Sequence, residues 1–140
     1  MKQLLGTIAV LIAIQFVPYG RNHVTPAVVT EPAWDSAATR ALAVRACFDC
    51  HSNQTRWPAY ARVAPLSWLI EHDVVEGRHA LNYSEWQRPQ THADDAPQMV
   101  IDHDMPPPLY RLMHSGARLS DAEREQLAAG LQRSLLQPVR

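Results

Sequence analysis

The chain has 140 residues, which is enough for one domain with a core of its own. Its formal net charge is −1, so the composition gives no sign of a nucleic-acid-binding protein. Of the thirteen Lys and Arg residues only Lys2 is a lysine, which excludes a docking surface built from lysines. From Glu31 onward there are eleven Arg and fourteen Asp or Glu residues, and this mildly acidic balance favours a basic partner.

An apolar segment opens the chain, because Lys2 is followed by a nearly unbroken apolar run from Leu4 to Val17. As a secretory signal the segment has a suitable length and a charged start, but its cleavage site is poor. As an anchor it is short of the roughly 20 residues that span a bilayer core, although Tyr19 and Arg21 suit the interface. We predict a membrane anchor in residues 1–20, with a signal segment as the alternative. Either one implies export of the remaining chain.

A linker is predicted after the apolar segment. Residues 21–33 contain two prolines and show no helical periodicity, and His23 within them is expected to be exposed. The first helix of the following domain should begin near Asp35 or Ser36, since both are good N-caps, and run toward Phe48.

The two cysteines of the chain both lie in one pentapeptide, Cys47-Phe48-Asp49-Cys50-His51. This C-x-x-C-H spacing is typical of c-type haem attachment, in which two thiols add to the two vinyl groups of one porphyrin. The adjacent His51 can then take the proximal axial position on the iron. The motif therefore predicts one covalent haem c.

Three other interpretations of the cysteine pair remain open. A thioredoxin-like redox disulfide would be expected between a strand and a helix, which the sequence does not predict here. A structural disulfide across two residues would be strained. A zinc site would need ligands from later histidines, whose spacing is loose; these are His72, His79, His92, His103 and His114.

An aromatic pair follows the motif, at Trp57 and Tyr60. Both side chains are candidates for packing on the porphyrin, and the alternative is an ordinary place in the core. Arg56 and Arg62 are either partners of the haem propionates or surface charges.

Two further helices are predicted in the middle of the chain. The first covers residues 64–78, with Pro65 near its start and Gly77 as its stop, and exposes His72. The second is short, begins at Asp94 or Asp95, and runs toward Asp102. The second helix should bury Met99, Val100 and Ile101.

The chain ends in a predicted helix that packs on the domain, against its first helix. Ser120 and Glu123 have the spacing of a capping box. Leu127, Leu131 and Leu135 then form one apolar stripe.

A methionine before three prolines is the candidate for the second haem ligand. Met105 precedes Pro106-Pro107-Pro108, and prolines restrain the residue before them to extended backbone. It stands 54 positions after His51, which leaves room for two helices to cross the haem. We predict Met105 as the distal ligand, because Met/His coordination is an established haem ligation. His103 would instead give a bis-histidine iron, and Met99 and Met113 are expected in packing roles.

Taken together, these segments resemble the bacterial haem-binding-domain family, whose members are small, exported, membrane-anchored monohaem cytochromes. Nearly the whole chain carries the resemblance, in this order: Gln15–Arg21, Cys47–Pro58, Ala64–Leu69, Gly77-Arg78, Leu81–Trp86, Met105-Pro106-Pro107, Tyr110, His114 and Leu119-Ser120. Ala59 replaces an expected aromatic residue, and Asp104 also departs from the usual residue before Met105.

The resemblance implies an all-α, class I-like cytochrome c domain around one haem, here residues 34–140. It implies attachment at Cys47 and Cys50, with His51 and Met105 on the iron. We therefore expect an electron carrier rather than an enzyme, on the periplasmic side of the bacterial inner membrane. Its expected partners are redox proteins, foremost membrane oxidoreductases. The rival hypotheses are a haem enzyme or sensor with an open or displaceable distal position, and a structural subunit of a complex.

Overall fold

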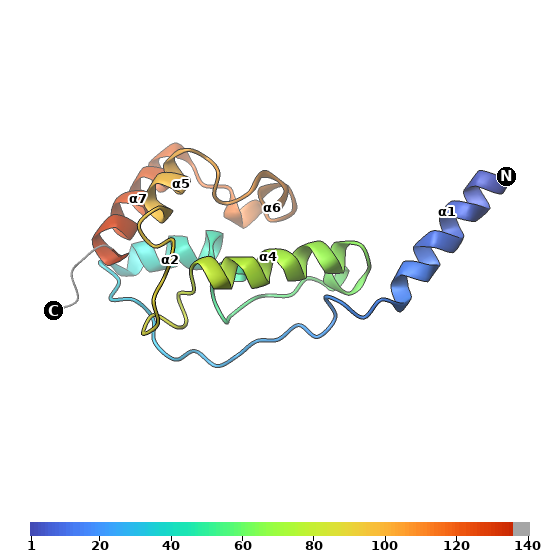
Figure 1. The fold of residues 1–140 in the computed structure, drawn as a ribbon. Coiled ribbons are helices and arrows are strands. Elements are labelled where there is room, and N and C mark those ends of the chain that lie inside the picture. The colour runs from blue at the N-terminus through green and yellow to red at the C-terminus, as the bar shows by residue number, and fades with distance from the viewer. Residues whose placement is uncertain (136–140) are drawn as a thin grey trace.

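The computed structural model describes residues 1–135, whose regular elements are helical. In chain order they are α1 (Lys2–Ala13), η1 (Ile14–Phe16), α2 (Ala37–Ala46), α3 (Phe48–His51), η2 (Ala59–Arg62), α4 (Leu66–Ala80), α5 (Ala96–Ile101), α6 (Pro108–Met113), η3 (Ser115–Ala117) and α7 (Asp121–Leu135). Figure 1 shows α4 along one side of the main body and α5, α6 and α7 along the other, with α2 between them. The expected all-α class is therefore confirmed.

The start of the first domain helix is confirmed. Ser36 caps α2, because its hydroxyl accepts a hydrogen bond from the backbone N–H of Thr39 at 3.1 Å. The predicted helix toward Phe48 is interrupted, however, since Cys47 leaves the helical conformation (φ −122°). The haem motif consequently begins at a break, and α3 starts a new direction for the chain.

The C-terminal helix α7 is also built as predicted. The backbone N–H of Ser120 donates to the Glu123 carboxylate at 2.9 Å, and the N–H of Glu123 donates back to the Ser120 hydroxyl at 3.2 Å. Leu127 and Leu131 are at most 1% exposed and Leu135 is 9% exposed. This stripe packs α7 against α2 and α5, and each leucine contributes about 2 kcal/mol through burial.

The predicted stop of α4 is wrong. Gly77 lies inside the helix, which continues to Ala80. A Cβ atom at this position would lie 2.6 Å from the carbonyl oxygen of Cys50. The glycine is therefore needed for the close approach of α4 to α3, and it does not end the helix. The predicted exposure of His72 on the same helix is confirmed.

The short helix α5 forms where it was predicted, but only part of its expected buried side is buried. Val100 is 2% exposed and Met99 is half-buried, whereas Ile101 is 40% exposed. A helix as short as α5 presents only a narrow face to the core, and Ile101 lies outside that face. Val100 joins a core with Phe48 and Tyr83, whose rings are stacked with their centroids 5.5 Å apart.

The segment of residues 21–33 lies against the domain. The backbone N–H groups of Val29 and Thr30 donate to the carbonyl of Ser84 at 2.9 and 3.1 Å. His23 stacks on Trp57 with ring centroids 4.5 Å apart. The expectation of an exposed His23 is therefore wrong, because the aromatic partner covers one face of its ring.

The helix α1 stands apart from the main body in Figure 1, and its side chains are exposed. None of the helices within residues 1–135 combines the length and the apolar character needed to cross a membrane.

Candidate haem site

The C-x-x-C-H motif folds as one tight turn of helix between α2 and α4. The backbone N–H of His51 donates to the carbonyl of Cys47 at 2.9 Å, which closes the turn. Phe48 points into the core and is 3% exposed, while Cys47 and Cys50 are half-buried. The turn thus leaves both thiols and the imidazole to line the space beside it.

The hydrogen bonds of His51 fix its tautomer. Its Nδ1 lies 2.9 Å from the carbonyl oxygen of Gly77 and 3.1 Å from that of Leu81. Both partners are acceptors, so Nδ1 carries the proton and Nε2 keeps a free lone pair. Burial lowers the pKa of His51 and outweighs these two bonds, which act in the opposite direction. The side chain is therefore a neutral imidazole, as a metal ligand requires.

The two thiols are also neutral. Burial raises the pKa of Cys47 to about 12, with a smaller contribution from Cys50. Burial and then the charges of Asp73 and Asp49 raise the pKa of Cys50 to about 12. A thioredoxin-like cysteine needs a lowered pKa to act as a nucleophile, so these surroundings disfavour that interpretation.

The zinc and disulfide interpretations find no support in the described part of the chain. Within residues 1–135, no group of three or more His, Cys, Asp or Glu side chains is placed to hold a metal ion. Cys47 and Cys50 are free thiols. His72, His79, His92 and His103 are exposed, and His114 stacks on Tyr110 with ring centroids 4.2 Å apart.

Two adjoining cavities lie beside the motif, and they share Cys47, His51, Ala80 and Met105 in their walls. The first has a volume of about 180 Å³ and is almost entirely apolar, with walls completed by Leu81, Tyr83, His92, Asp95, Ala96, Met99, Val100 and Leu131. The second has a volume of about 300 Å³ and is completed by Ala46, Cys50, Asp73, Glu76, Gly77, Pro106, Pro107 and Tyr110. The shared residues make them two parts of one hollow between α4 and α5.

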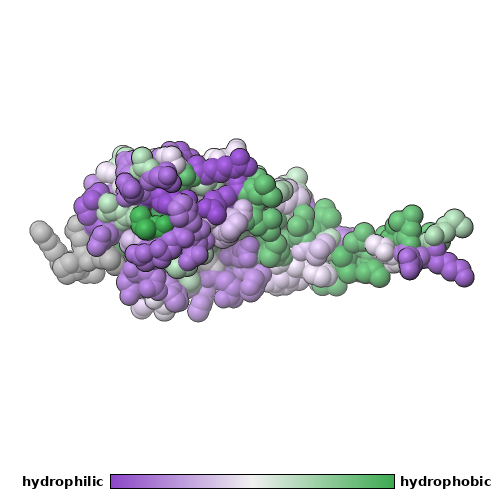
Figure 2. Space-filling model, turned by 90° about the horizontal axis from the view of Figure 1, so that it is seen from above, coloured by the Kyte–Doolittle hydropathy of each residue, from purple (hydrophilic) through white to green (hydrophobic). Residues whose placement is uncertain are grey.

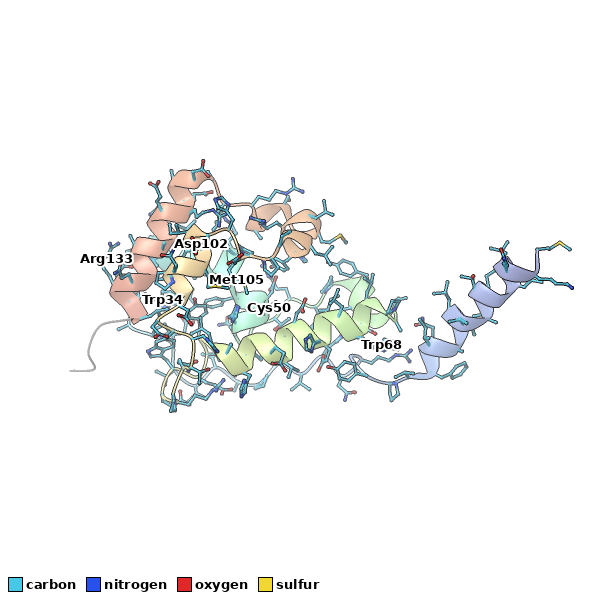
Figure 3. All side chains as sticks on the ribbon, turned by 45° about the horizontal axis from the view of Figure 1, so that its top comes forward. Trp34, Cys50, Trp68, Asp102, Met105 and Arg133 are labelled. Atoms are coloured by element: carbon cyan, nitrogen blue, oxygen red, sulfur yellow. The ribbon has the colours of Figure 1, made fainter. Side chains whose placement is uncertain are left out.

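The loop that follows α5 carries Met105 to this hollow. Figure 3 shows Met105 and Cys50 near each other in the middle of the main body. The backbone N–H of Met105 donates to the carbonyl of Met99 at 3.0 Å. The guanidinium of Arg124, which is 4% exposed, donates to the carbonyls of Val100 at 2.6 Å and Met105 at 3.1 Å. One buried arginine therefore ties the loop to α5 and α7.

The competing distal ligands lie in different places. Met99 and His92 line the first cavity, but the second is lined by neither of them. His103 is exposed and has a left-handed backbone (φ 66°), and Met113 is 52% exposed on α6. Of the methionines, Met105 is the one that lines both halves of the hollow.

The aromatic candidates lie at other sites. Trp57 stacks on His23 and is absent from the walls of both cavities. Tyr60 lines a separate small pocket beside Cys50, and its hydroxyl lies 3.4 Å from Nε2 of His114.

The carboxylate of Asp49 is the centre of a network next to this pocket. It accepts hydrogen bonds from the Tyr110 hydroxyl at 2.6 Å and from Nε and Nη2 of Arg56 at 3.0 and 3.1 Å. Burial raises the pKa of Asp49, but the bonds from Arg56 and Tyr110 outweigh it and leave the pKa below its ordinary value. Arg56 is thus paired with a side chain of the motif itself.

The residues of the hollow fit a haem. A porphyrin requires apolar walls, and the first cavity provides them. Iron requires a neutral imidazole with a free nitrogen, and the hydrogen bonds of His51 provide one. Two thiols stand next to that imidazole, and a thioether lines the same space.

Several residues of the site were missed by the sequence analysis. The carbonyls of Gly77 and Leu81, which orient His51, leave no trace in a sequence because any residue supplies a carbonyl. Arg124 did leave a signal. It occupies the first position of the apolar stripe that continues through Leu127 and Leu131, and a charged residue on such a face needs a buried partner.

Comparison with known proteins gives a family and no individual relative. Neither the curated proteins nor the solved structures include a significant match to this chain. The model of the family described as "Haem-binding domain" matches residues 9–133. That range contains the motif, both cavities and Arg124, and it covers most of the sequence. The chain therefore belongs to the haem-binding domain family.

Proposed function

We propose that this protein is an exported, membrane-anchored cytochrome with one covalent haem c, and that it transfers electrons. Its haem domain is a class I-like cytochrome c domain of residues 34–140. The observation that carries the proposal is the state of His51. The neutral imidazole of the C-x-x-C-H turn is oriented by the carbonyls of Gly77 and Leu81. It lines an apolar hollow together with a methionine.

Cys47 and Cys50 bind the haem through thioether bonds in this proposal. Both thiols are protonated at neutral pH, so attachment consumes two S–H groups and leaves no buried negative charge. His51 coordinates the iron through Nε2, while its Nδ1–H remains bonded to the carbonyls of Gly77 and Leu81. These bonds hold the ring plane and increase its basicity.

Met105 would supply the second ligand to the iron, because its side chain lines both cavities. A thioether has no charge and no proton, so it suits an apolar wall and favours the reduced metal. The bound haem supplies a one-electron couple. Separate hydrogen bonds hold the two ligand residues in place. The Gly77 carbonyl accepts a bond from His51, and Arg124 donates a bond to the carbonyl of Met105. Little rearrangement is then needed when the charge of the metal changes.

The mouth of the hollow favours a basic redox partner. Asp73 and Glu76 are exposed residues in the wall of the second cavity, and Asp95 is an exposed residue in the wall of the first. Carboxylates around an electron-transfer site attract a positively charged surface and accelerate encounter at low salt. A membrane oxidoreductase with basic residues near its own cofactor has the required chemistry.

Two measurements test this proposal on the exported, membrane-extracted protein. Haem that stays on the chain during denaturing electrophoresis, and is lost when Cys47 and Cys50 are both changed to alanine, would support covalent attachment. Reduction by dithionite without subsequent carbon monoxide binding would support a six-coordinate electron carrier. Ready binding of carbon monoxide, or turnover of peroxide, would instead favour the enzyme or sensor.

A further inference from the structure

The connection between α1 and the haem domain is fixed at its first residues. Gln15 in η1 makes two hydrogen bonds with Ala64, just before α4. The backbone N–H of Ala64 donates to Oε1 at 3.0 Å, and Nε2 donates to the Ala64 carbonyl at 2.9 Å. Two bonds to one residue define both the distance and the orientation of η1. A loose linker would make neither.

A second contact follows five residues later. Gly20 has a left-handed backbone (φ +75°), and a Cβ atom there would overlap the carbonyl of Ser67 in α4. The position therefore requires glycine twice, for its φ and for the close approach. Arg21 then turns back and donates to the carbonyl of Gln15. The segment from η1 to Arg21 therefore packs against the start of α4.

A third contact completes the attachment. His23 stacks on Trp57, and its Nε2 lies 3.1 Å from the carbonyl of Ala61 in η2. Because η2 directly precedes the turn that holds Gln15, all three contacts meet the same corner of the domain. These contacts fix η1 on the domain, and α1 joins the domain through η1.

Exposed apolar side chains occupy this corner. Val63 is 52% exposed, Leu66 is 42% exposed and Leu69 is 41% exposed. We call these three residues the apolar foot. Figure 2 shows hydrophobic surface on α1 and on the adjoining end of the main body. The foot therefore continues a surface that begins on α1, whose own leucines and isoleucines are uncovered.

The exposed charges beside the foot are positive, and Glu71, whose Cβ lies against Gly20, is half-buried. Arg62 precedes Val63, and Arg21 lies on the connection, and both are exposed. Residues 1–30 and 57–70 contain no Asp or Glu. The acidic residues Asp73 and Glu76 lie farther along α4, at the hollow. Apolar side chains flanked by arginines match a lipid surface, with hydrocarbon below and phosphate at the level of the cations.

We infer that the apolar foot rests in the lipid surface and that the haem domain is held at a fixed orientation above the bilayer. This inference rests on the membrane anchoring of the proposed function and replaces a flexible tether by a rigid support. Leu69 and Gly77 are eight residues apart on α4, which corresponds to about 12 Å at 1.5 Å per residue. The hollow is therefore kept close to the membrane, where a membrane-bound partner can reach it.

The orientation of the haem is the direct measure of this inference. The holoprotein is reconstituted in oriented bilayers of phosphatidylcholine and phosphatidylglycerol, and haem absorption is recorded with polarised light at several angles of incidence. A rigid support predicts clear dichroism. The change Gln15→Met keeps the size of the side chain but removes both bonds to Ala64, so the dichroism should be lost. Gln3→Met is the matched control, because Gln3 is exposed at the start of α1, and it should leave the signal unchanged.

A second pair of variants tests the lipid contact itself. Leu69→Ser places a hydroxyl in the foot and should reduce the dichroism, whereas Val75→Ser, at an exposed position farther along α4, should not. Dichroism that survives Gln15→Met, or a vesicle-bound wild type without dichroism, would overturn the inference. Dichroism that appears in native membranes but not in pure lipid would assign the foot to a partner protein and would also overturn it.

Flotation of the same vesicles separates this inference from the proposed function. Protein that floats and exchanges electrons but shows no haem orientation refutes the rigid support alone. Protein that does not float refutes the membrane anchoring, and the support with it. The Gln15→Met variant should float and retain its absorption spectrum, which shows that it is folded.

Discussion

The two walls of the hollow are built in different ways. The wall that bears His51 consists of α3 and α4 in close contact. The Nδ1 of His51 is hydrogen-bonded to two carbonyls, and Gly77 of α4 lies against the backbone of Cys50. The wall that bears Met105 is a loop, joined to the helices by the hydrogen bond from its own N–H to Met99 and by the buried Arg124. The proximal side is therefore fixed by packing, whereas the distal side depends on a few polar contacts.

In the proposed function, this difference would decide how firmly each of the two iron ligands is held. A wall made of packed backbone cannot shift without breaking the core, so His51 should remain in place across redox states. A loop held by Arg124 can be weakened without unfolding the domain. Changes at the distal side should therefore affect the spectrum more than the fold, and changes at the proximal side should affect both.

The largest effect is expected from Gly77→Ala. The new methyl group would meet the backbone carbonyl of Cys50 at 2.6 Å, and because backbone cannot move aside, this overpacking should cost more than about 3 kcal/mol. The better helix propensity of alanine returns only about 1 kcal/mol. We expect a lower melting temperature and poor haem incorporation, measured by calorimetry and by the ratio of haem to protein. Gly116→Ala is the control, since its nearest neighbour would be the Cγ of Arg45 at 3.8 Å.

Arg124→Met should have the next largest effect and should act on the distal wall. It removes the guanidinium that donates to the carbonyls of Val100 and Met105, at a cost of about 2 kcal/mol. For the proposed haem ligation we expect partial loss of the methionine ligand, and carbon monoxide binding that is not expected of the wild type. Arg133→Met removes an ion pair with Asp35 that does not line the hollow, and it should change neither. An unaltered spectrum in Arg124→Met would mean that the loop keeps its position without this anchor.

Tyr110→Phe should cost about 1.5 kcal/mol, because it removes a hydrogen bond to the buried Asp49 carboxylate. The pKa of Asp49 in the folded protein lies below its ordinary value of 3.8. The stabilisation by the ionised Asp49 carboxylate is therefore fully present above the ordinary pKa of 3.8. It is lost as the pH falls through the lower pKa of Asp49 in the folded protein. Urea unfolding at pH 7 and at pH 3 should show the variant closer to the wild type at pH 3. Tyr60→Phe is the control, because its contact with His114 is longer at 3.4 Å.

The smallest effect is expected from Ser120→Ala at the start of α7. The loss of the hydroxyl that caps Glu123 N–H should cost about 1 kcal/mol. Because Ser120 is exposed and neither Ser120 nor Glu123 lines the hollow, the absorption spectrum should not change. A spectral change would show that the N-terminal cap of α7 affects the Met105 loop through Arg124.

The sequence predicted those features that depend on local chemistry. The caps at Ser36 and Ser120, the buried face of Leu127 and Leu131, and the presence of α2, α4, α5 and α7 follow from propensity and periodicity, whereas α6 was not predicted. It could not predict contacts between segments. Gly77 was interpreted as a helix stop because glycine ends many helices, and only the approach of α3 explains its place. His23 was expected to be exposed because nothing near it in the sequence indicates Trp57.

The candidate site divides in the same way. Cys47, Cys50, His51 and Met105 were found from two short motifs, and the structure places all four in the walls of one hollow. The carbonyl pair on His51 and the role of Arg124 depend on tertiary packing. Trp57 lies outside both cavity walls, beside a residue of the connection from α1.

The most direct test of the whole account is the charge-transfer band of methionine on ferric haem iron. It should be recorded side by side for the wild type, Met105→Ala and Met99→Leu. The two methionines line the same cavity, so the pair separates the proposed ligand from its nearest rival. Ligation by Met105 predicts the band in the wild type and in Met99→Leu, and its loss in Met105→Ala. A band that persists in Met105→Ala, or that disappears in Met99→Leu, would contradict it.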